Sequence, residues 1–179
     1  MLLLTIPAGE YWDEASETFF FTKEVKLRLE HSLISISKWE SKWCIPFYSS
    51  NKTPEQLIHY VQCMCLNPDV DPEVFKRLTP DNIKAINEYI AAPMTASTVK
   101  ETNGAKRSSE IVTSELIYYW MIEFGIPESF EKWHLNRLMM LIRICSEKAK
   151  PSKGMSKREI MQQNKALNAA RRARLHSKG

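Results

Sequence analysis

Glycine is scarce in this 179-residue chain, which contains only five. So low a content argues against a collagen-like repeat, a flexible linker protein and a glycine-rich loop that cradles phosphates. The sequence also lacks an apolar run near the roughly 20 residues that a membrane span needs. Its apolar start, Met1–Ile6, is short, has no basic segment and is soon followed by acidic residues, unlike a signal peptide. These absences predict a soluble cytoplasmic protein that does not bind membranes.

Motifs that carry catalytic or metal chemistry are missing as well. None of the patterns G-x-S-x-G, G-x-x-x-x-G-K-[ST] and H-E-x-x-H occurs. His134 lies in a run of large apolar residues, where a structural histidine is the more frequent role. Cys63 and Cys65 follow His59 by about one helical turn, but a zinc site usually needs a second pair of ligands. We therefore expect no enzymatic activity, no metal site and no cofactor, and free thiols at the four cysteines.

The net charge of +4 is unevenly distributed along the chain. Residues 148–179 contain ten Lys or Arg against one acid, Glu159, and therefore carry +9, whereas residues 1–147 carry −5. This division predicts a slightly acidic globular domain over residues 1–147 and a basic linker and C-terminal helix over residues 148–179. The partner of the basic segment should be anionic or present an acidic protein surface.

Residues 1–46 contain stretches typical of β-structure, and the alternation of apolar and polar residues is strict in Val25–Glu30. Leu2–Ile6, Thr18–Thr22 and Val25–Glu30 each read as a strand, and Pro7–Gly9 reads as a turn. Together they predict a small antiparallel sheet or hairpin. The following segment, Ser32–Trp43, fits a helix with a broad apolar face better than a further strand.

Residues 53–147 have a helical pattern. Thr53-Pro54, Asp71-Pro72 and Thr79-Pro80 each place a capping residue before a proline at the first helical position, which predicts three short helices. A polar, exposed connection is expected over residues 91–107. The predicted fold class is thus α+β and predominantly helical, with a small N-terminal antiparallel β-element, a helical bundle and a basic C-terminal helix.

Two longer apolar helices are predicted in the second half of this domain. Ser108 or Ser109 is expected to cap the first, which ends at Gly125. Ile126-Pro127-Glu128 is expected to open the second, which continues to Cys145. Both are apolar over more than one face, which predicts a position at the centre of the domain or in an interface.

The capping box of Ser156–Glu159 predicts a C-terminal helix from Lys157 to Leu175. With few large apolar residues it has little to bury on its own domain, so docking on a protein partner is favoured over nucleic-acid binding through Arg171–Arg174 and over a solvated end. In the helix predicted over Ser32–Trp43, two tryptophans are spaced i, i+4; such residues more often belong to a core, but they are kept as a candidate exposed patch. The candidate partner-binding residues are Lys157, Arg158, Ile160, Met161, Leu167, Arg171, Arg172, Arg174, Trp39 and Trp43.

Six stretches spread over most of the chain carry a resemblance: Lys23–Leu33, Ser37–Trp43, Ala92–Ala96, Ser114–Met121, Trp133–Leu138 and Met155–Arg172. In them the chain resembles small proteins from the structural gene clusters of tailed bacteriophages, and in particular the tail assembly chaperones. The resemblance implies a mostly helical protein with a β-rich start. It also implies binding to the tape measure protein and help in polymerising tail tube protein around it, in the host cytoplasm.

Two other function classes are alternatives to a tail assembly chaperone. A structural protein of the tail or the head–tail connector would come from the same gene clusters and would be found in the virion. A nucleic-acid-binding accessory protein would act through the basic C-terminal helix. Self-association is a further expectation for any of the three classes.

Overall fold

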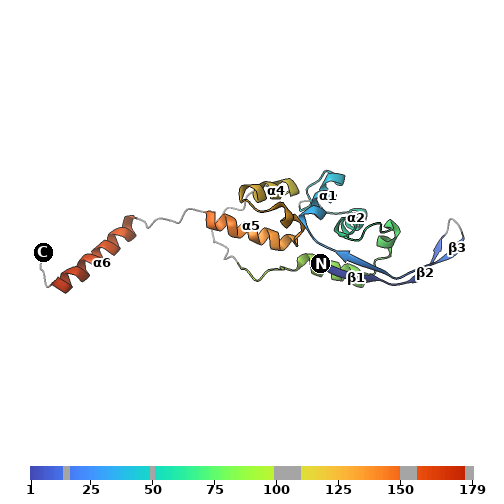
Figure 1. Cartoon of the computed structure of the whole chain (residues 1–179), viewed down its shortest axis with the longest axis horizontal. Coiled ribbons are helices and arrows are strands. Elements are labelled where there is room, and N and C mark those ends of the chain that lie inside the picture. The colour runs from blue at the N-terminus through green and yellow to red at the C-terminus, as the bar shows by residue number, and fades with distance from the viewer. Residues whose placement is uncertain (14–16, 49–50, 99–109, 150–156, 176–179) are drawn as a thin grey trace. The chain divides into compact units, whose positions relative to one another are not determined.

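The fold is α+β and mainly helical, as the sequence predicts. The computed structural model describes residues 1–13, 17–48, 51–98, 110–149 and 157–175 (Figure 1). The chain divides into two units, Met1–Ser146 and Glu147–Gly179. Among the described residues, none of the helices combines the length and the apolar character that crossing a membrane requires.

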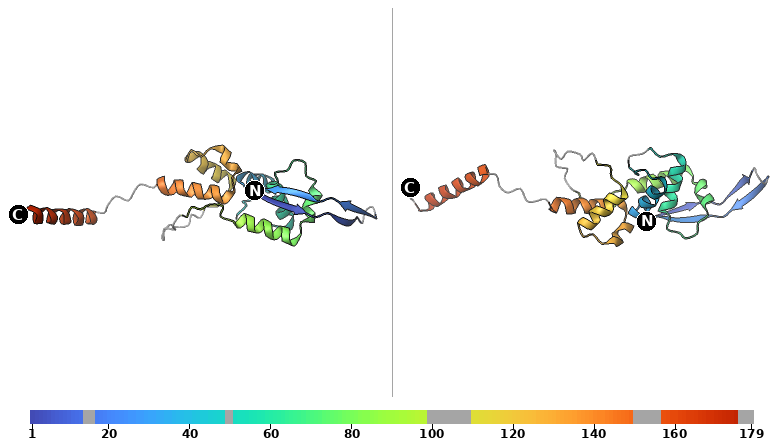
Figure 2. Two further views of the ribbon diagram at one scale, coloured as in Figure 1. Left: turned by 60° about the horizontal axis from the view of Figure 1, so that its bottom comes forward. Right: turned by 90° about the horizontal axis from the view of Figure 1, so that it is seen from above.

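The N-terminal strands form one long hairpin with two successive ladders. β1 (Leu2–Ile6) pairs antiparallel with β4 (Val25–Leu29), and β2 (Gly9–Asp13) pairs antiparallel with β3 (Thr18–Thr22). The chain therefore does not reverse at Pro7–Gly9, and the predicted turn is wrong: Gly9 begins β2, which the sequence analysis missed. The two ladders meet where the Gly9 N–H and carbonyl bond the Thr22 hydroxyl at 3.2 and 3.0 Å. Figure 2 shows β2 and β3 extending away from the helices of this unit.

The first helices begin where their capping residues predict. α1 (Leu33–Trp43), α2 (Pro54–Met64) and α3 (Pro80–Ala91) start after Ser32, Thr53 and Thr79, each of which forms a reciprocal capping box with the residue three positions on. Such a box satisfies two backbone N–H groups at the helix start. The segment after Asp71 is shorter and tighter than an α-helix: η1 (Pro72–Arg77) is a 3₁₀ helix.

The predicted start of the next helix is wrong. α4 (Ser114–Glu123) begins after Thr113, whose hydroxyl accepts from the Leu116 N–H, while Ser108 and Ser109 lie outside the described residues. The reason is tertiary: the Glu40 carboxylate of α1 accepts the Ser114 N–H at 2.7 Å and so fixes the first turn of α4.

The single helix predicted from Ile126 to Cys145 is also wrong, because the chain forms η2 (Glu128–Lys132) and then α5 (Leu135–Ala149). Between them His134 forms an isolated bridge with Ser32, and the Leu135 N–H donates to the His31 carbonyl at 2.7 Å. These long-range bonds hold the backbone in an extended form that the local sequence does not specify.

The core lies between one face of the β1–β4 ladder and the helices. α1 occupies a central place, since it packs against α2, α4 and η2. Side chains from the ladder, from α1 and from α5 are fully buried, and burial of each large apolar side chain stabilises the fold by about 1.5–3 kcal/mol. The fully buried large side chains are Ile6, Leu27, Leu29, Leu33, Ile36, Trp39, Met64, Ile117, Leu135 and Leu138.

The second unit contains α6 (Lys157–Leu175), with the bounds that the sequence predicts. Every side chain described on this helix is exposed. Ser156, the predicted capping residue, lies outside the described residues.

Candidate protein-binding surfaces

Helix α4 is apolar on three of its faces. One face carries Ile117 and Met121 into the core, where they are 0% and 2% exposed. A second carries Tyr119 and Ile122, which are 57% and 79% exposed. Glu115, Tyr119 and Ile122 share a face at helical spacing. Tyr119 and Ile122, the two apolar side chains on this face, form one outward patch. A helix that is apolar around most of its surface is typical of an interface.

The third face of α4 lines a groove against α5. Its volume is about 680 Å³, and its charged side chains, Glu123 and Arg143, come from opposite helices. Met139 and Met140 contribute pliable side chains, which adapt to partners of varied shape. The residues lining this α4–α5 groove are Trp120, Glu123, Phe124, Asn136, Met139, Met140, Ile142, Arg143 and Ser146.

The position of α4 depends on a buried carboxylate. Glu40 is 7% exposed; its Oε1 accepts the Phe47 N–H and its Oε2 accepts the Ser114 N–H, both at 2.7 Å. Lys52 lies 3.9 Å above the Phe47 ring and donates to the Phe47 carbonyl. Because hydrogen bonds to an ionised group are stronger than neutral ones, Glu40 fixes the loop after α1 and the start of α4 together.

A second groove lies between α2 and α3, with η1 also in its wall. It has a volume of about 310 Å³ and is mostly apolar. Leu57 and Ile83 stand at its mouth and are 51% and 49% exposed. The lining residues of this α2–α3 groove are Pro54, Leu57, Ile58, Tyr60, Val61, Phe75, Lys76, Leu78, Ile83, Ile86, Asn87 and Ile90.

The β2–β3 ladder exposes aromatic side chains. Phe19 and Phe21 are 60% and 81% exposed, and both lie on the same face because strand side chains alternate. The register pairs Phe21 with Glu10 and Phe19 with Trp12. An isolated two-stranded ladder is marginal in water, so this apolar face is a further candidate contact.

No family model, curated protein or solved structure matches this chain. The surfaces described above are therefore interpreted from their own chemistry.

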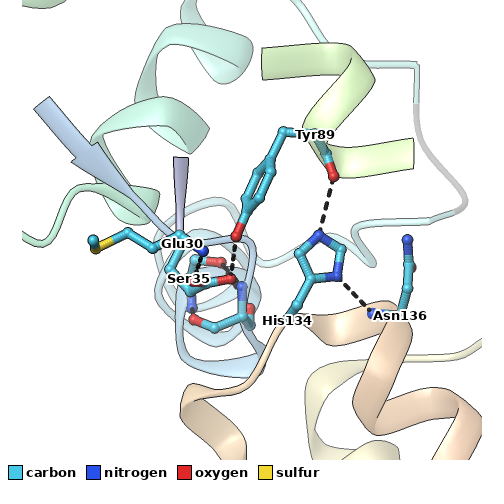
Figure 3. A network of polar contacts seen from close by, with 7 residues as sticks. Glu30, Ser35, Tyr89, His134 and Asn136 are labelled. Carbon is cyan, nitrogen blue, oxygen red and sulfur yellow. Dashed lines mark hydrogen bonds and ion pairs between the residues drawn. The ribbon is translucent and has the colours of Figure 1, made fainter. Parts of the chain in front are cut away.

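A buried polar cluster joins the N-terminal strands to the later helices (Figure 3). The Tyr89 hydroxyl donates to Glu30 Oε1 at 2.6 Å. His134 lies beyond it, with Nε2 3.0 Å from the Tyr89 carbonyl and Nδ1 accepting the Asn136 N–H at 3.3 Å. A carbonyl can only accept and a backbone N–H can only donate, so His134 carries its proton on Nε2 and is neutral. Burial lowers the pKa of His134, in agreement with that state.

His31 extends the same cluster toward α2. Its ring lies 5.1 Å from the His134 ring, centroid to centroid, and its Nδ1 hydrogen-bonds the Tyr60 hydroxyl. Burial, assisted by His134, lowers the pKa of His31 to about 4, and burial also raises the pKa of Tyr60. Both histidines are less than a tenth exposed and have hydrogen-bond partners. The arrangement is that of a structural cluster, as the sequence predicts for His134.

The predicted tryptophan patch is wrong for Trp39. Its side chain is 0% exposed and its indole N–H donates to the Gln56 carbonyl at 2.9 Å, so it cannot contact a partner. Trp43, one turn later, is half-buried and donates to His59 Nδ1 at 3.2 Å. The prediction failed because α2 packs against both side chains, and Trp39 is covered completely whereas Trp43 is covered only in part.

The candidate residues of α6 have the exposure that partner binding requires. Ile160, Met161 and Leu167 are 44%, 72% and 50% exposed. The side chain of Lys157 lies outside the described residues. The remaining candidates, Arg158, Arg171, Arg172 and Arg174, are exposed.

The cysteines do not form a metal site with His59. Cys63 Sγ lies 3.7 Å from His59 Nδ1, and burial raises the pKa of the Cys63 thiol. Cys65 follows α2 as its C-terminal cap, and its Sγ contacts Asn67. Across the described ranges, no three His, Cys, Asp or Glu side chains come together in a way that could hold a metal ion.

The amino-acid sequence did not indicate the two grooves or the aromatic face of β3. It did indicate that the helices around residues 114 and 135 are apolar on several faces, but not which faces are left open. The three consecutive phenylalanines of Thr18–Thr22 were the available indication for Phe19 and Phe21, because successive strand residues lie on opposite faces and a two-stranded ladder leaves one face uncovered unless helices pack on both sides.

Proposed function

We propose that this protein is a non-enzymatic protein-binding factor in phage tail morphogenesis: a tail assembly chaperone that binds the tape measure protein and assists assembly of the tail tube. The sequence resemblance supplies the biological setting. The observation that supports protein binding is α4, which lines the α4–α5 groove on one side and exposes Tyr119 and Ile122 on another. An amphipathic helix laid into this groove would place its apolar side chains against methionine and aromatic residues.

The chemistry of the groove suits reversible binding of a long helical protein. Met139 and Met140 can repack against successive segments of different sequence. Charges of both signs at the rim, Glu123 and Arg143, favour a partner helix that carries charges flanking its apolar stripe. A mixed interface of this kind can release its partner when tube subunits take its place.

Co-expression with the neighbouring structural genes tests the proposal. A tagged full-length protein should recover tape measure or tube protein after nuclease treatment. The variant Ile122→Asp should recover at least tenfold less, because it places a charge in the centre of the apolar patch of α4. Ile83→Asp, which places the same charge at a half-exposed isoleucine in the α2–α3 groove, is the control and should recover wild-type amounts.

Two results would contradict the proposal. Equal recovery by wild type and Ile122→Asp would remove the outward patch of α4 from the interface. Detection of the protein at stoichiometric amounts in purified phage particles would favour a structural tail or head–tail connector protein, because an assembly chaperone should be absent from the finished particle.

A further inference from the structure

The α2–α3 groove and helix α6 are complementary in apolar character and in charge. We propose that α6 of one copy docks in the α2–α3 groove of a second copy, so that the protein associates head to tail through a helix-in-groove contact. This inference does not depend on the tape measure partner proposed above.

The groove offers an apolar floor with an open mouth. Ile86 and Phe75 are each 3% exposed in its wall, whereas Leu57 and Ile83 stand half-exposed at its mouth. Covering the half-exposed Leu57 and Ile83 side chains with a second apolar surface is favourable, because it removes apolar area from water and desolvates no polar group of these side chains. The groove is therefore ready to accept an apolar stripe of modest size.

The segment of the chain that forms this groove is acidic. Residues 54–91 contain six acids, all exposed, against three bases, and the exposed Lys76 is paired with Glu73 at 2.7 Å. This segment thus carries a net charge of −3. The six acids are Glu55, Asp69, Asp71, Glu73, Asp81 and Glu88. An occupant of the groove should therefore carry positive charge beside its apolar residues.

Helix α6 has that combination. Ile160 and Leu167 are seven residues apart, so they lie on one face about two turns apart, and they are 44% and 50% exposed. The helix Lys157–Leu175 carries six bases and one acid, a net charge of +5. Arg171 lies on the same face one turn after Leu167, so the helix carries positive charge beside its apolar residues.

The choice of a second copy over an unrelated partner rests on this match. The chain itself carries both an apolar groove formed by an acidic segment and, among its described elements, the only strongly basic helix, which also has an apolar stripe. Each copy would offer one helix and accept another, which is a heterologous contact.

Sedimentation equilibrium of the full-length, nuclease-treated protein tests the association. Wild type should show a molar mass that rises above the monomer with concentration and falls again at high salt, because exposed opposite charges are screened. Ile83→Asp in the groove and Leu167→Asp in the helix should each weaken association at least tenfold. Gln162→Asp adds the same charge about 200° around α6 from Ile160 and should leave association unchanged.

Mixing the two defective variants gives the decisive result. Ile83→Asp retains an intact helix and Leu167→Asp retains an intact groove, so an equimolar mixture should form heterodimers although neither variant associates alone. Circular dichroism of each variant checks that the fold is kept, and Ile122→Asp should associate as wild type does. Failure of this proposal is thus separable from failure of the tape measure interaction.

Three outcomes would overturn it. A monomeric mass at every concentration would exclude the second copy as occupant. Association that survives both Ile83→Asp and Leu167→Asp would place the contact elsewhere. Association seen only before nuclease treatment and abolished by replacing Arg171 and Arg172 would assign α6 to nucleic acid instead.

Discussion

Two tryptophans one helical turn apart illustrate how burial sets the role of single residues. Trp39 is 0% exposed and hydrogen-bonds the Gln56 carbonyl, whereas Trp43 is half-buried. Trp39→Ala should lower the free energy of unfolding by about 3–5 kcal/mol, because it removes a large core side chain and leaves a cavity. Trp43→Ala should cost clearly less. Urea unfolding of both variants checks the order, and a larger loss for Trp43 would contradict the assigned packing.

Glu40 is the residue on which the position of α4 depends. Glu40→Ala should lower the free energy of unfolding by about 3 kcal/mol, because it leaves the buried N–H groups of Phe47 and Ser114 without an acceptor. Hydrogen exchange should also become faster at the start of α4. Glu24→Ala, which removes an exposed carboxylate, is the control and should change neither measurement. Equal effects of the two substitutions would show that Glu40 does not fix the start of α4.

At the scale of elements, the caps determine where helices begin. Thr113 precedes α4, and its hydroxyl accepts the Leu116 N–H. Thr113→Ala should lower the free energy of unfolding by about 1 kcal/mol, whereas Thr113→Ser should retain most of the cap. Chemical denaturation measures both. If alanine and serine behave alike, the capping bond does not stabilise α4.

Whether an element could be predicted from sequence depends on whether the bonds that fix its start are local or long-range. Thr53-Pro54 and Thr79-Pro80 determine their helix starts through bonds within four residues, so the predicted and observed starts agree. The break before α5 depends on bonds from His134 and Leu135 to a segment a hundred residues earlier. The local pattern of apolar and polar residues does not reflect such long-range contacts. It therefore predicts one long helix where the chain forms η2 and α5.

The candidate surfaces also divide into one that local composition predicts and others that depend on tertiary packing. The exposure of Ile160 and Leu167 follows from the composition of α6 itself, which offers too few apolar residues to build a core of its own. Whether Trp39, Tyr119 or Ile122 faces water depends on which neighbour covers each face of its helix. That is decided by tertiary packing, so the α4 patch and both grooves became visible only in the structure.

At the scale of the whole first unit, the polar cluster of His31 and His134 joins distant elements. Glu30 and His31 follow β4, Tyr60 lies on α2, Tyr89 on α3, and His134 stands just before α5. Losing one bond of this cluster therefore loosens several helices at once. The unit should respond to protonation of the cluster by unfolding as a whole, and not by local fraying.

The sign of the pH dependence follows from His31. Burial lowers its pKa in the folded state to about 4 from the ordinary 6.5, so the unfolded chain binds more protons between these values. The contribution of His31 to the free energy of unfolding should therefore be highest above pH 6.5. It should fall by ~3 kcal/mol as the pH drops toward 4 and stay constant below pH 4. His31→Gln should be less stable at neutral pH but show a flatter profile. Urea unfolding across this range measures the slope, and an imidazole of His31 that titrates near pH 6.5 in the folded protein by NMR would refute the assignment.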